Sequence, residues 1–408
     1  MKKTLMSLSL ILIVILALTG CYEWPDPIWN PDDTGLATPT ITGVDVTTLL
    51  GGIDDITITG SGFGNTADEL LVYFKKGTSV GRGRVIAATD TELIVEAPPV
   101  YSDSLEIWID RRGAFEYAKY TTNLITISSG IKKINITTES TMKQIAINES
   151  GDMWVALGSN KSMYHITADD SVTLVDGVSF AGTMNVLAMR SSGSDLYYTV
   201  REYIAKYDGA IDRHKVNPDK NPLSDFAFAN NGKIYLVGEN NIYSTDHDMI
   251  NEAVAVLDTN YNYTKCEVYD GKLYAAATYV GSDTLRLLEK SIRTYPINTD
   301  GSLGTGEVII NWTEDFAGSV ITGITFDTDD KMYVATKTRT PIYVIEPVAG
   351  SYADGNIELL NPVILDAIIL SMRWDTGDYM SFITEDSEGL QAPNRLRMRT
   401  TASPNYMP

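Results

Sequence analysis

A short motif that recurs about every 40 residues constrains the fold of this chain more than any other feature of its sequence. Each copy is a glycine or aspartate followed three or four residues later by an aromatic residue or, in the last copy, by methionine. The copies lie at residues 151–154, 193–197, 232–235, 271–274, 330–333 and 377–380, so their last residues are 43, 38, 39, 59 and 47 positions apart. Such a period, with several strands in each unit, is typical of the blades of a β-propeller.

A short apolar segment precedes each copy, and it predicts the innermost strand of a blade, where space around the axis is tight. These segments are residues 144–147, 186–189, 225–228, 265–268, 323–326 and 370–374. In the third copy, Gly232 predicts a tight turn and residues 234–237 predict the second strand. A further turn at residues 239–241 is expected before a third strand at 242–243, and Tyr235 is expected to pack between blades.

The six copies predict six blades over residues 129–408, and the ring has to close. The last copy has a third strand at residues 395–399, after which little of the sequence remains. Residues 131–136 precede the first copy and belong to no unit. We therefore expect them to supply the outer strand of the last blade, because closure protects the sheet edges of a propeller.

Residues 39–128 predict a separate β-sandwich. Segments at 56–59, 70–74, 92–96 and 104–109 are rich in β-branched and apolar residues and are separated by turns, as in an immunoglobulin-like fold. The sequence GSGFG at residues 60–64, followed by TDTELIVEAPP at residues 89–99, resembles the IPT/TIG immunoglobulin-like domain. This resemblance implies a spacer or interaction module. The fold class expected for the chain is therefore all-β, an immunoglobulin-like sandwich followed by a six-bladed propeller.

The N-terminus predicts export. Lys2 and Lys3 precede an apolar run at residues 8–18, which is shorter than the roughly 20 residues of a membrane-spanning helix. The sequence LTGC ending at Cys21 resembles the bacterial lipobox, which implies that residues 1–20 are a signal peptide and that Cys21 is acylated. Residues 21–38 read as a tether rich in Pro and Asp. We expect an outer-membrane lipoprotein, periplasmic or exposed at the cell surface, with its lipid as the membrane partner.

The net charge of the chain and its cysteine content each exclude one class of interaction. The 53 acidic residues against 32 basic ones give a net charge of −21, which disfavours nucleic acid as a ligand. Cys266 is the second and last cysteine, so an intramolecular disulfide is not expected after acylation of Cys21.

The propeller repeats SDFAFANNGKIYLVG (224–238) and ITGITFDTDDKMYVATKTRTPIYVIEP (321–347) resemble the NHL and gluconolactonase-like group. Enzymes of that group hold a divalent cation with Glu, Asn and Asp at the starts of inner strands. Lys143, Ser224 and Thr322 stand at the matching positions here, and Asp225 is a single carboxylate. We therefore predict no metal, no cofactor and no catalytic residue. A metal-dependent lactonase- or lyase-like hydrolase remains the alternative, and the aspartates at 327, 329 and 330 are a weak candidate for calcium.

The predicted function is that of a non-catalytic binding module. Ligands are expected on the face that carries the loops before inner strands and after second strands, and a mixed polar set there suits a glycan, peptide or protein. The candidate residues are Lys143, Asn185, Arg201, Asp225, Glu239, Lys265, Lys337 and Arg339.

Overall fold

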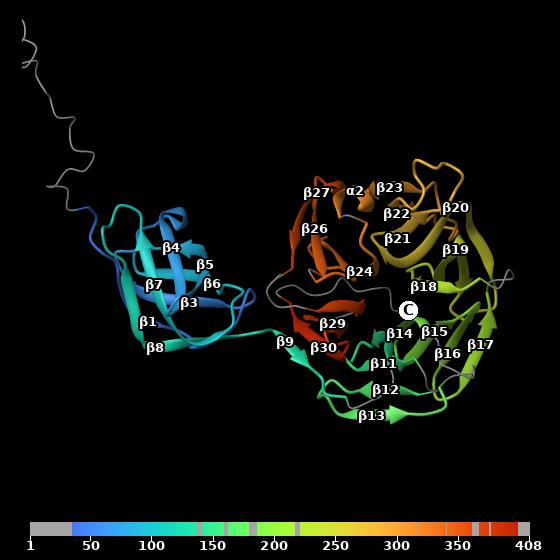
Figure 1. Cartoon of the computed structure of the whole chain (residues 1–408), viewed down its shortest axis with the longest axis horizontal. Helices are drawn as coiled ribbons and strands as arrows, with labels where there is room; N and C mark the ends of the chain where they lie inside the picture. Colours follow the sequence, from blue (N-terminus) through green and yellow to red (C-terminus); the bar gives the residue numbers. More distant parts are fainter. Residues whose placement is uncertain are drawn as a thin grey trace, which may run out of the picture.

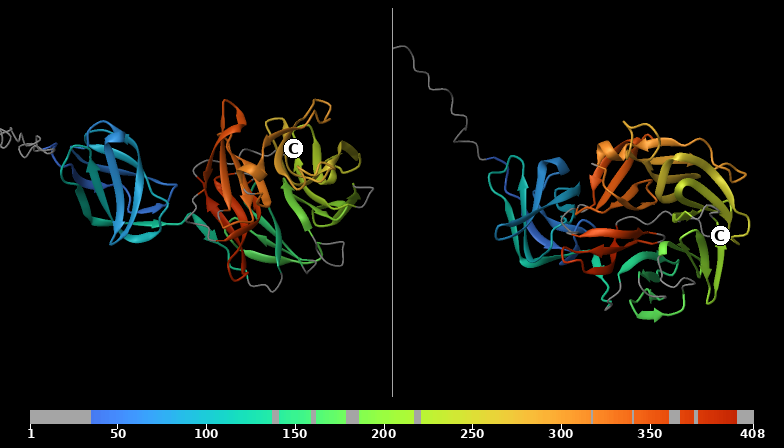
Figure 2. Two further views of the ribbon diagram at one scale, coloured as in Figure 1. Left: turned by 45° about the horizontal axis from the view of Figure 1, so that its top comes forward. Right: turned by 45° about the vertical axis from the view of Figure 1, so that its right-hand side comes forward.

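The computed structural model describes residues 35–136, 141–158, 162–178, 186–216, 221–316, 318–339, 341–360, 367–374 and 377–398. The predicted signal peptide, Cys21 and nearly all of the tether lie outside these residues, so the structure does not test acylation. Within the described part of the chain, no helix has the length and apolarity needed to span a bilayer. The protein is all-β, with a small first domain beside a larger ring of sheets (Figures 1 and 2).

The first domain is a sandwich of eight strands around one core. The strands are β1 (Thr40–Val44), β2 (Thr48–Leu50), β3 (Asp55–Ser61), β4 (Leu70–Lys76), β5 (Ser79–Ala88), β6 (Glu92–Glu96), β7 (Ser102–Arg111) and β8 (Ala118–Ser128), with a short 3-10 helix η1 (Ala67–Glu69). They hydrogen-bond in the order β1-β3-β6-β5-β4-β7-β8-β2. Burial alternates along β4, where Leu70, Val72 and Phe74 point inward.

The backbone of this domain explains the glycines of the GSGFG sequence at residues 60–64. A Cβ on Gly60 would lie 1.9 Å from the carbonyl oxygen of Thr40, so the close approach of β1 and β3 requires glycine there. Gly62 and Gly64 adopt positive φ angles of 77° and 83°. The turn they form places Phe63 in the core with no exposed surface.

The propeller consists of five antiparallel sheets. Three four-stranded sheets hold β10 (Met142–Ile147), β11 (Met153–Leu157), β12 (Met163–Ile166) and β13 (Val172–Val175); β14 (Val186–Ser192), β15 (Asp195–Val200), β16 (Tyr203–Tyr207) and β17 (Ile211–Lys215); and β24 (Ile321–Phe326), β25 (Met332–Thr336), β26 (Ile342–Val348) and β27 (Ser351–Leu359). A six-stranded sheet holds β18 (Leu223–Phe228), β19 (Lys233–Asp246), β20 (Ala253–Tyr269), β21 (Lys272–Tyr279), β22 (Lys290–Pro296) and β23 (Glu307–Ile310), followed by the short helix α2 (Trp312–Asp315). The last sheet holds β28 (Ile368–Arg373), β29 (Tyr379–Glu385), β30 (Gln391–Arg397) and β9 (Ile131–Lys133).

The third and fourth copies of the motif share one sheet because β19 and β20 are long. The sequence predicts a turn at residues 239–241, and β19 reverses its direction there, where Asn240 has a φ of 63°. The two ends of β19 consequently lie close together: Phe228, which pairs with Ile234 near the start of β19, has its ring centroid 5.2 Å from that of His247, just beyond the end of β19. Glu239 pairs with Asn262, and Asn241 pairs with Leu257. The four residues skipped on β20 mark the place where the sheet bends from one repeat into the next.

The predicted closure of the ring is confirmed. Ile131, Lys132 and Lys133 of β9 pair with Leu396, Arg395 and Asn394 of β30, so the strand after the first domain becomes the outer strand of the last sheet. The amide of Ile134 extends the contact by donating to the carbonyl of Pro393 over 2.9 Å.

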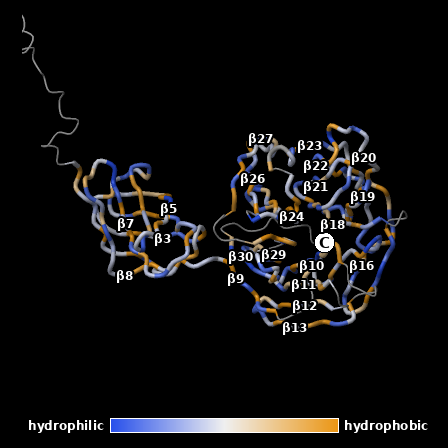
Figure 3. The backbone as a smooth tube through the Cα atoms, in the orientation of Figure 1, coloured by the Kyte–Doolittle hydropathy of each residue, from blue (hydrophilic) through white to orange (hydrophobic). Residues whose placement is uncertain are grey.

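The repeated aromatic residue packs between neighbouring repeats, as predicted for Tyr235, which has no exposed surface and lies in a core formed by the third and fourth repeats. Tyr333 of β25 contacts Trp374 beyond β28 edge to face, with ring centroids 5.1 Å apart. The glycine of the motif serves the turn before it, because Gly232 has a φ of 75°. In the fifth copy Asp330 takes the place of this glycine at a φ of 64°, which aspartate tolerates better than most residues. Apolar segments accordingly follow the strands of both domains (Figure 3).

Deleting residues 1–136 is expected to destabilise the propeller more than deleting residues 1–128, because only the longer deletion removes β9. It exposes one edge of the last sheet and takes away Ile131 and Ile134, and full burial of one isoleucine is worth about 1.5–3 kcal/mol. In thermal unfolding, we expect the Tm of the shorter protein to be lower by at least about 5 °C. Equal Tm values would contradict the importance of this closure.

Candidate functional site

The inner strands of all six repeats carry a β-bulge at the same place. The register shifts lie between residues 142 and 144, 186 and 188, 223 and 225, 263 and 265, 321 and 323, and 369 and 371. The extra residues are Lys143, Leu187, Ser224, Thr264, Thr322 and Leu370. Bulges redirect side chains and are common beside functional sites. The charged side chains next to this shared position are therefore candidates for a functional site at the axis of the propeller.

Five charged residues follow these bulges and form what we call the axial cluster: Arg190, Asp225, Lys265, Glu267 and Arg373. Asp225 and Lys265 are each the first residue after a bulge residue. Arg190, Glu267 and Arg373 are each the third residue after one. Exposure ranges from 0% for Asp225 to 8% for Lys265. The inner strands of the six repeats neighbour one another in a closed ring, β10-β14-β18-β20-β24-β28, and four of them carry the axial cluster.

The first ion pair joins two strands that are not neighbours. The Arg190 guanidinium on β14 donates from Nη1 to both carboxylate oxygens of Glu267 on β20, over 3.1 and 2.9 Å. Its Nη2 donates to the carbonyl of Cys266 over 2.7 Å. Since β18 lies between β14 and β20 in the ring, this pair bridges the inner strand of another repeat.

The second ion pair spans the ring from β28 to β18. Arg373 donates from Nη2 to Oδ1 of Asp225 over 2.8 Å, and from Nε to the carbonyl of Met189 over 3.3 Å. Three steps separate β28 and β18 in either direction around the ring. The two pairs therefore connect inner strands across the centre of the propeller.

Asp225 is held as a buried anion. Its carboxylate also accepts the amides of Phe226 over 3.0 Å and Cys266 over 3.2 Å. Burial alone would raise the pKa of this carboxyl, but Arg373, Lys265 and Arg190 together outweigh that effect and hold the pKa below its ordinary value. Asp225 thus has little capacity left for a metal ion.

Lys265 is the weakly supported member of the axial cluster. Burial lowers the pKa of its ammonium; Asp225 opposes this change, whereas Arg373 and Arg190 add to it. No described residue accepts a hydrogen bond from its Nζ.

The structure divides the predicted binding residues into two groups. Asp225 and Lys265 lie together in the axial cluster, whereas Lys143, Arg201, Glu239, Lys337 and Arg339 are exposed. Asn185 lies outside the described residues. The sequence prediction missed Arg190, Glu267 and Arg373, although their common position three residues after the bulge residue was a usable signal.

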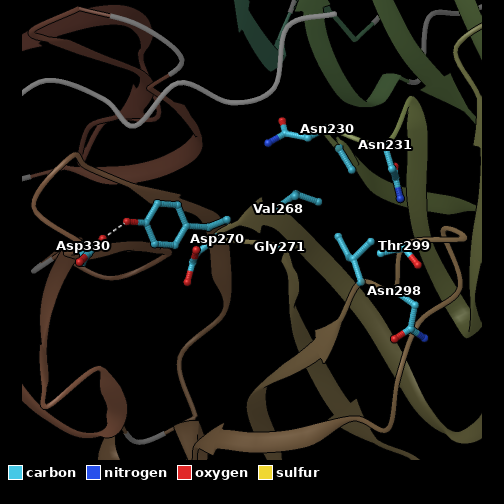
Figure 4. A pocket seen from close by; sticks show the side chains of 11 residues that line it. Asn230, Asn231, Val268, Asp270, Gly271, Asn298, Thr299 and Asp330 are labelled. Atoms are coloured by element: carbon cyan, nitrogen blue, oxygen red, sulfur yellow. Dashed lines mark hydrogen bonds between the residues drawn. The ribbon is translucent and has the colours of Figure 1, made fainter.

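A pocket of about 690 Å³ lies on the opposite side from the predicted face (Figure 4). We call this side the turn face, because it carries the hairpin turns between the first and second strands of the repeats. The pocket is lined by Ala229, Asn230, Asn231, Val268, Tyr269, Asp270, Gly271, Ile297, Asn298, Thr299 and Asp330. Its residues come from turns of three copies of the motif and from the β22–β23 turn, which the sequence alone could not bring together.

The pocket offers polar groups that are free to meet a ligand. Asn230, Asp270 and Thr299 are exposed, and their side chains make no hydrogen bond to another described residue. The ring of Tyr269 stacks on Phe326 with centroids 4.3 Å apart, and its hydroxyl donates to Asp330. The wall therefore combines an amide, a carboxylate, a hydroxyl and a fixed aromatic ring.

Other polar groups near this pocket serve the turns. Asn231 accepts the amide of Lys233 over 3.0 Å, and the Asn298 amide donates to Ser302 over 2.9 Å. In the aspartate cluster proposed for calcium, Asp327 accepts the amides of Asp329 and Lys331 over 2.9 and 2.8 Å. The described residues contain no group of three or more potential ligands placed to hold a metal.

Asp225→Ala is expected to destabilise the protein by about 3–5 kcal/mol, because it leaves the Arg373 guanidinium buried without its carboxylate. Since the folded-state pKa of Asp225 is lowered, its stabilisation is present above the unfolded pKa of about 3.9 and disappears as the pH falls through the folded-state pKa. Urea unfolding at pH 7 and along an acid series measures both effects.

Asp212→Ala is the control, because the Asp212 side chain is 69% exposed beside His214. We expect it to change stability by less than about 0.5 kcal/mol. If the two variants are equally stable, the ion pair at the axis has no structural role.

Comparisons with known proteins agree with this architecture. The IPT/TIG domain family matches residues 39–127. A luciferin-regenerating enzyme has a TM-score of 0.50 and 12% identity over 67% of this chain and 97% of its own. A catalytically inactive variant of virginiamycin B lyase from Staphylococcus aureus, solved with quinupristin, has a TM-score of 0.46 and 14% identity, covering 66% of this chain and 99% of its own.

A structural genomics protein of unknown function from Bacteroides thetaiotaomicron covers 91% of this chain and 100% of its own, with 13% identity and a TM-score of 0.48. No curated protein sequence gives a significant match. At these identities, structural similarity concerns the fold alone. Residues 39–127 thus form a domain that matches the IPT/TIG family, and the rest of the described chain is a ring of antiparallel sheets with the fold of a β-propeller.

Proposed function

We propose that this protein is a lipid-anchored, extracytoplasmic binding module whose propeller takes a carbohydrate in the pocket of the turn face. The observation that carries the proposal is the set of unpartnered polar side chains, Asn230, Asp270 and Thr299, around a pocket of about 690 Å³. Pockets that bind small molecules commonly range from about 300 to 1,000 Å³.

The chemistry of the wall favours a neutral sugar over other small ligands. Sugar hydroxyl groups both donate and accept hydrogen bonds, and the amide of Asn230 and the hydroxyl of Thr299 can each do the same. Asp270 adds an acceptor for a hydroxyl donor. Tyr269 supplies an aromatic surface that is held in place by Phe326 and Asp330. An anionic ligand is disfavoured here because Asp270 and Asp330 carry negative charge.

Anchoring rests on the N-terminal sequence. Acylation of Cys21 would attach the chain to a membrane, and Tyr22 after the cysteine favours the outer membrane over the inner one. Residues 22–38 would then act as a tether and the IPT/TIG domain as a spacer that lifts the propeller. The arrangement suits capture of a polysaccharide or its fragments at the cell envelope.

The contacts of Asp225 disfavour the alternative of a metal-dependent hydrolase. Its oxygens already accept Arg373 and two backbone amides. The bulge residues Lys143, Ser224 and Thr322 occupy the places where metal-binding relatives are expected to have Glu, Asn and Asp. A divalent cation beside Arg373 and Lys265 would also meet two like charges in a poorly solvated site.

Asn230→Ala and Asp270→Ala are each expected to weaken saccharide binding by about tenfold, since a hydrogen bond to a ligand is worth on the order of 1–2 kcal/mol. Isothermal titration against a panel of neutral mono- and oligosaccharides measures the effect. Glu239→Ala is the matched control, because Glu239 is an exposed residue of the same repeat at the turn within β19, on the side opposite the pocket. Unchanged affinity in both pocket variants would contradict the assignment of the site.

Cys21→Ser is expected to abolish lipid labelling and release the protein from the membrane fraction, because serine lacks the thiol that receives the acyl group. Metabolic labelling with a fatty acid, followed by fractionation, measures both. A variant that stays labelled and membrane-bound would show that Cys21 is not the anchor.

A further inference from the structure

A second pocket lies where the first domain meets the propeller. It has a volume of about 410 Å³ and is lined by residues of both parts. The first domain contributes Gly52, Ile53 and Arg84, whereas the propeller contributes residues of β25, β26, β27 and β30 and of the turn before β25. Pockets that bind small molecules lie preferentially at domain interfaces and commonly measure about 300 to 1,000 Å³, so both the place and the size suit a ligand.

The floor of this pocket is apolar. Tyr333, Leu396 and Met398 belong to the buried core between the last two sheets of the propeller, and all three also line the pocket. Leu359 lines the same pocket and is 39% exposed. An apolar group of a ligand that covers this floor would remove apolar surface from water, which is the main favourable contribution to most association.

The propeller side of the pocket also carries charges of both signs. Asp329 and Glu358 are exposed, and Lys331 is half-buried. The two carboxylates and the ammonium make no hydrogen bond and no ion pair with another described residue. They therefore remain available to a ligand that carries an ammonium and a carboxylate of its own.

The first domain presents Arg84 to the same pocket. Arg84 is an exposed residue of β5, and its guanidinium donates from Nε to Oε2 of Glu96 over 2.9 Å. It also lies near enough to Glu358 to interact with it electrostatically, but no salt bridge joins these two side chains in the described part of the chain. Opposite charges of the two domains thus face each other across a space that a small molecule can fill.

The connection between the domains holds one edge of this pocket. The carbonyl of Gly130 accepts the amide of Arg397 over 3.0 Å, and Arg397 lines the pocket. A Cβ on Gly130 would lie 2.6 Å from Cδ1 of Ile53, so the first domain packs closely on the connection at this point. The lining residues of both domains are therefore kept near each other by the chain itself, which lowers the cost of ordering them on binding.

We propose that this pocket binds a small zwitterion with an apolar body, which is the chemistry of an apolar amino acid or of a short peptide with free termini. The carboxylate of the ligand meets Arg84 and Lys331. Its ammonium meets Glu358, and its apolar part lies on the floor at Leu359. An anion without an ammonium would be repelled by the two free carboxylates of the wall. The site shares no lining residue with the pocket of the turn face, so either assignment can fail without the other.

The test is isothermal titration of the full-length protein with three probes. L-leucine and L-leucyl-L-leucine are zwitterions with apolar side chains, whereas N-acetyl-L-leucinamide has the same apolar group and no charge. We expect each zwitterion to bind with a single molecule per chain and the uncharged compound to bind at least about tenfold more weakly. Tighter binding of the dipeptide assigns the site to peptides, and tighter binding of leucine assigns it to free amino acids.

Arg84→Ala and Glu358→Gln are each expected to weaken binding of the tighter zwitterion by about tenfold, because each variant removes one charged contact to the ligand. The first change lies in the first domain and the second in the propeller, so an effect of both places the ligand between them. Both residues are exposed, and we therefore expect the Tm of each variant to stay close to that of the natural protein.

Arg82→Ala is the matched control, because Arg82 is an exposed arginine of the same strand that does not line the pocket. It should leave the affinity unchanged. The proposal would be overturned by the absence of binding of either zwitterion at millimolar concentration, or by equal binding of N-acetyl-L-leucinamide. Unchanged affinity in Arg84→Ala or in Glu358→Gln, or an equal loss in Arg82→Ala, would overturn it as well.

Discussion

The ion pairs that cross the centre of the propeller are the interactions on which the rest of the structure depends. In a ring of sheets, each sheet contacts its two neighbours. These contacts do not connect the inner strands that face one another across the centre, because those strands never pair. Arg190 with Glu267 and Arg373 with Asp225 tie such strands together. Charges buried this deeply stabilise a fold only when their geometry is complete, which is why each guanidinium also donates to a backbone carbonyl.

The β-bulges explain how the axial cluster can form. A regular strand would continue its alternation, whereas an extra residue shifts the following side chains to the other face of the sheet. The same shift occurs in every repeat, yet the first and fifth repeats place no charge after it; Gln144 and Gly323 directly follow their bulges. The bulge common to all repeats thus fixes where the side chains point, and the residues that differ between repeats decide where charges lie.

Much of the fold could be predicted from local patterns. The period of the motif, the turn at Gly232 and the spare segment that became β9 all depend on residues close in sequence. The pairing of Arg373 with Asp225 could not be predicted, because the partners are 148 positions apart and meet only once the ring has closed. The pocket of the turn face could not be predicted for the same reason, because Asn230, Asp270 and Thr299 come from different turns. The turn at residues 239–241 also depends on local sequence, because asparagine tolerates the left-handed conformation that Asn240 adopts there.

The short connection between the two domains has a mechanical consequence. Only Ser129 and Gly130 separate β8 of the IPT/TIG domain from β9, the strand that closes the ring, and the carbonyl of Gly130 accepts the amide of Arg397 over 3.0 Å. Any tension that reaches the propeller through its N-terminal domain is therefore carried first by the ladder between β9 and β30. Shearing that ladder would open the ring before any other sheet bears load, so the hydrogen bonds that close the propeller are also the first to carry a force applied to the N-terminal domain.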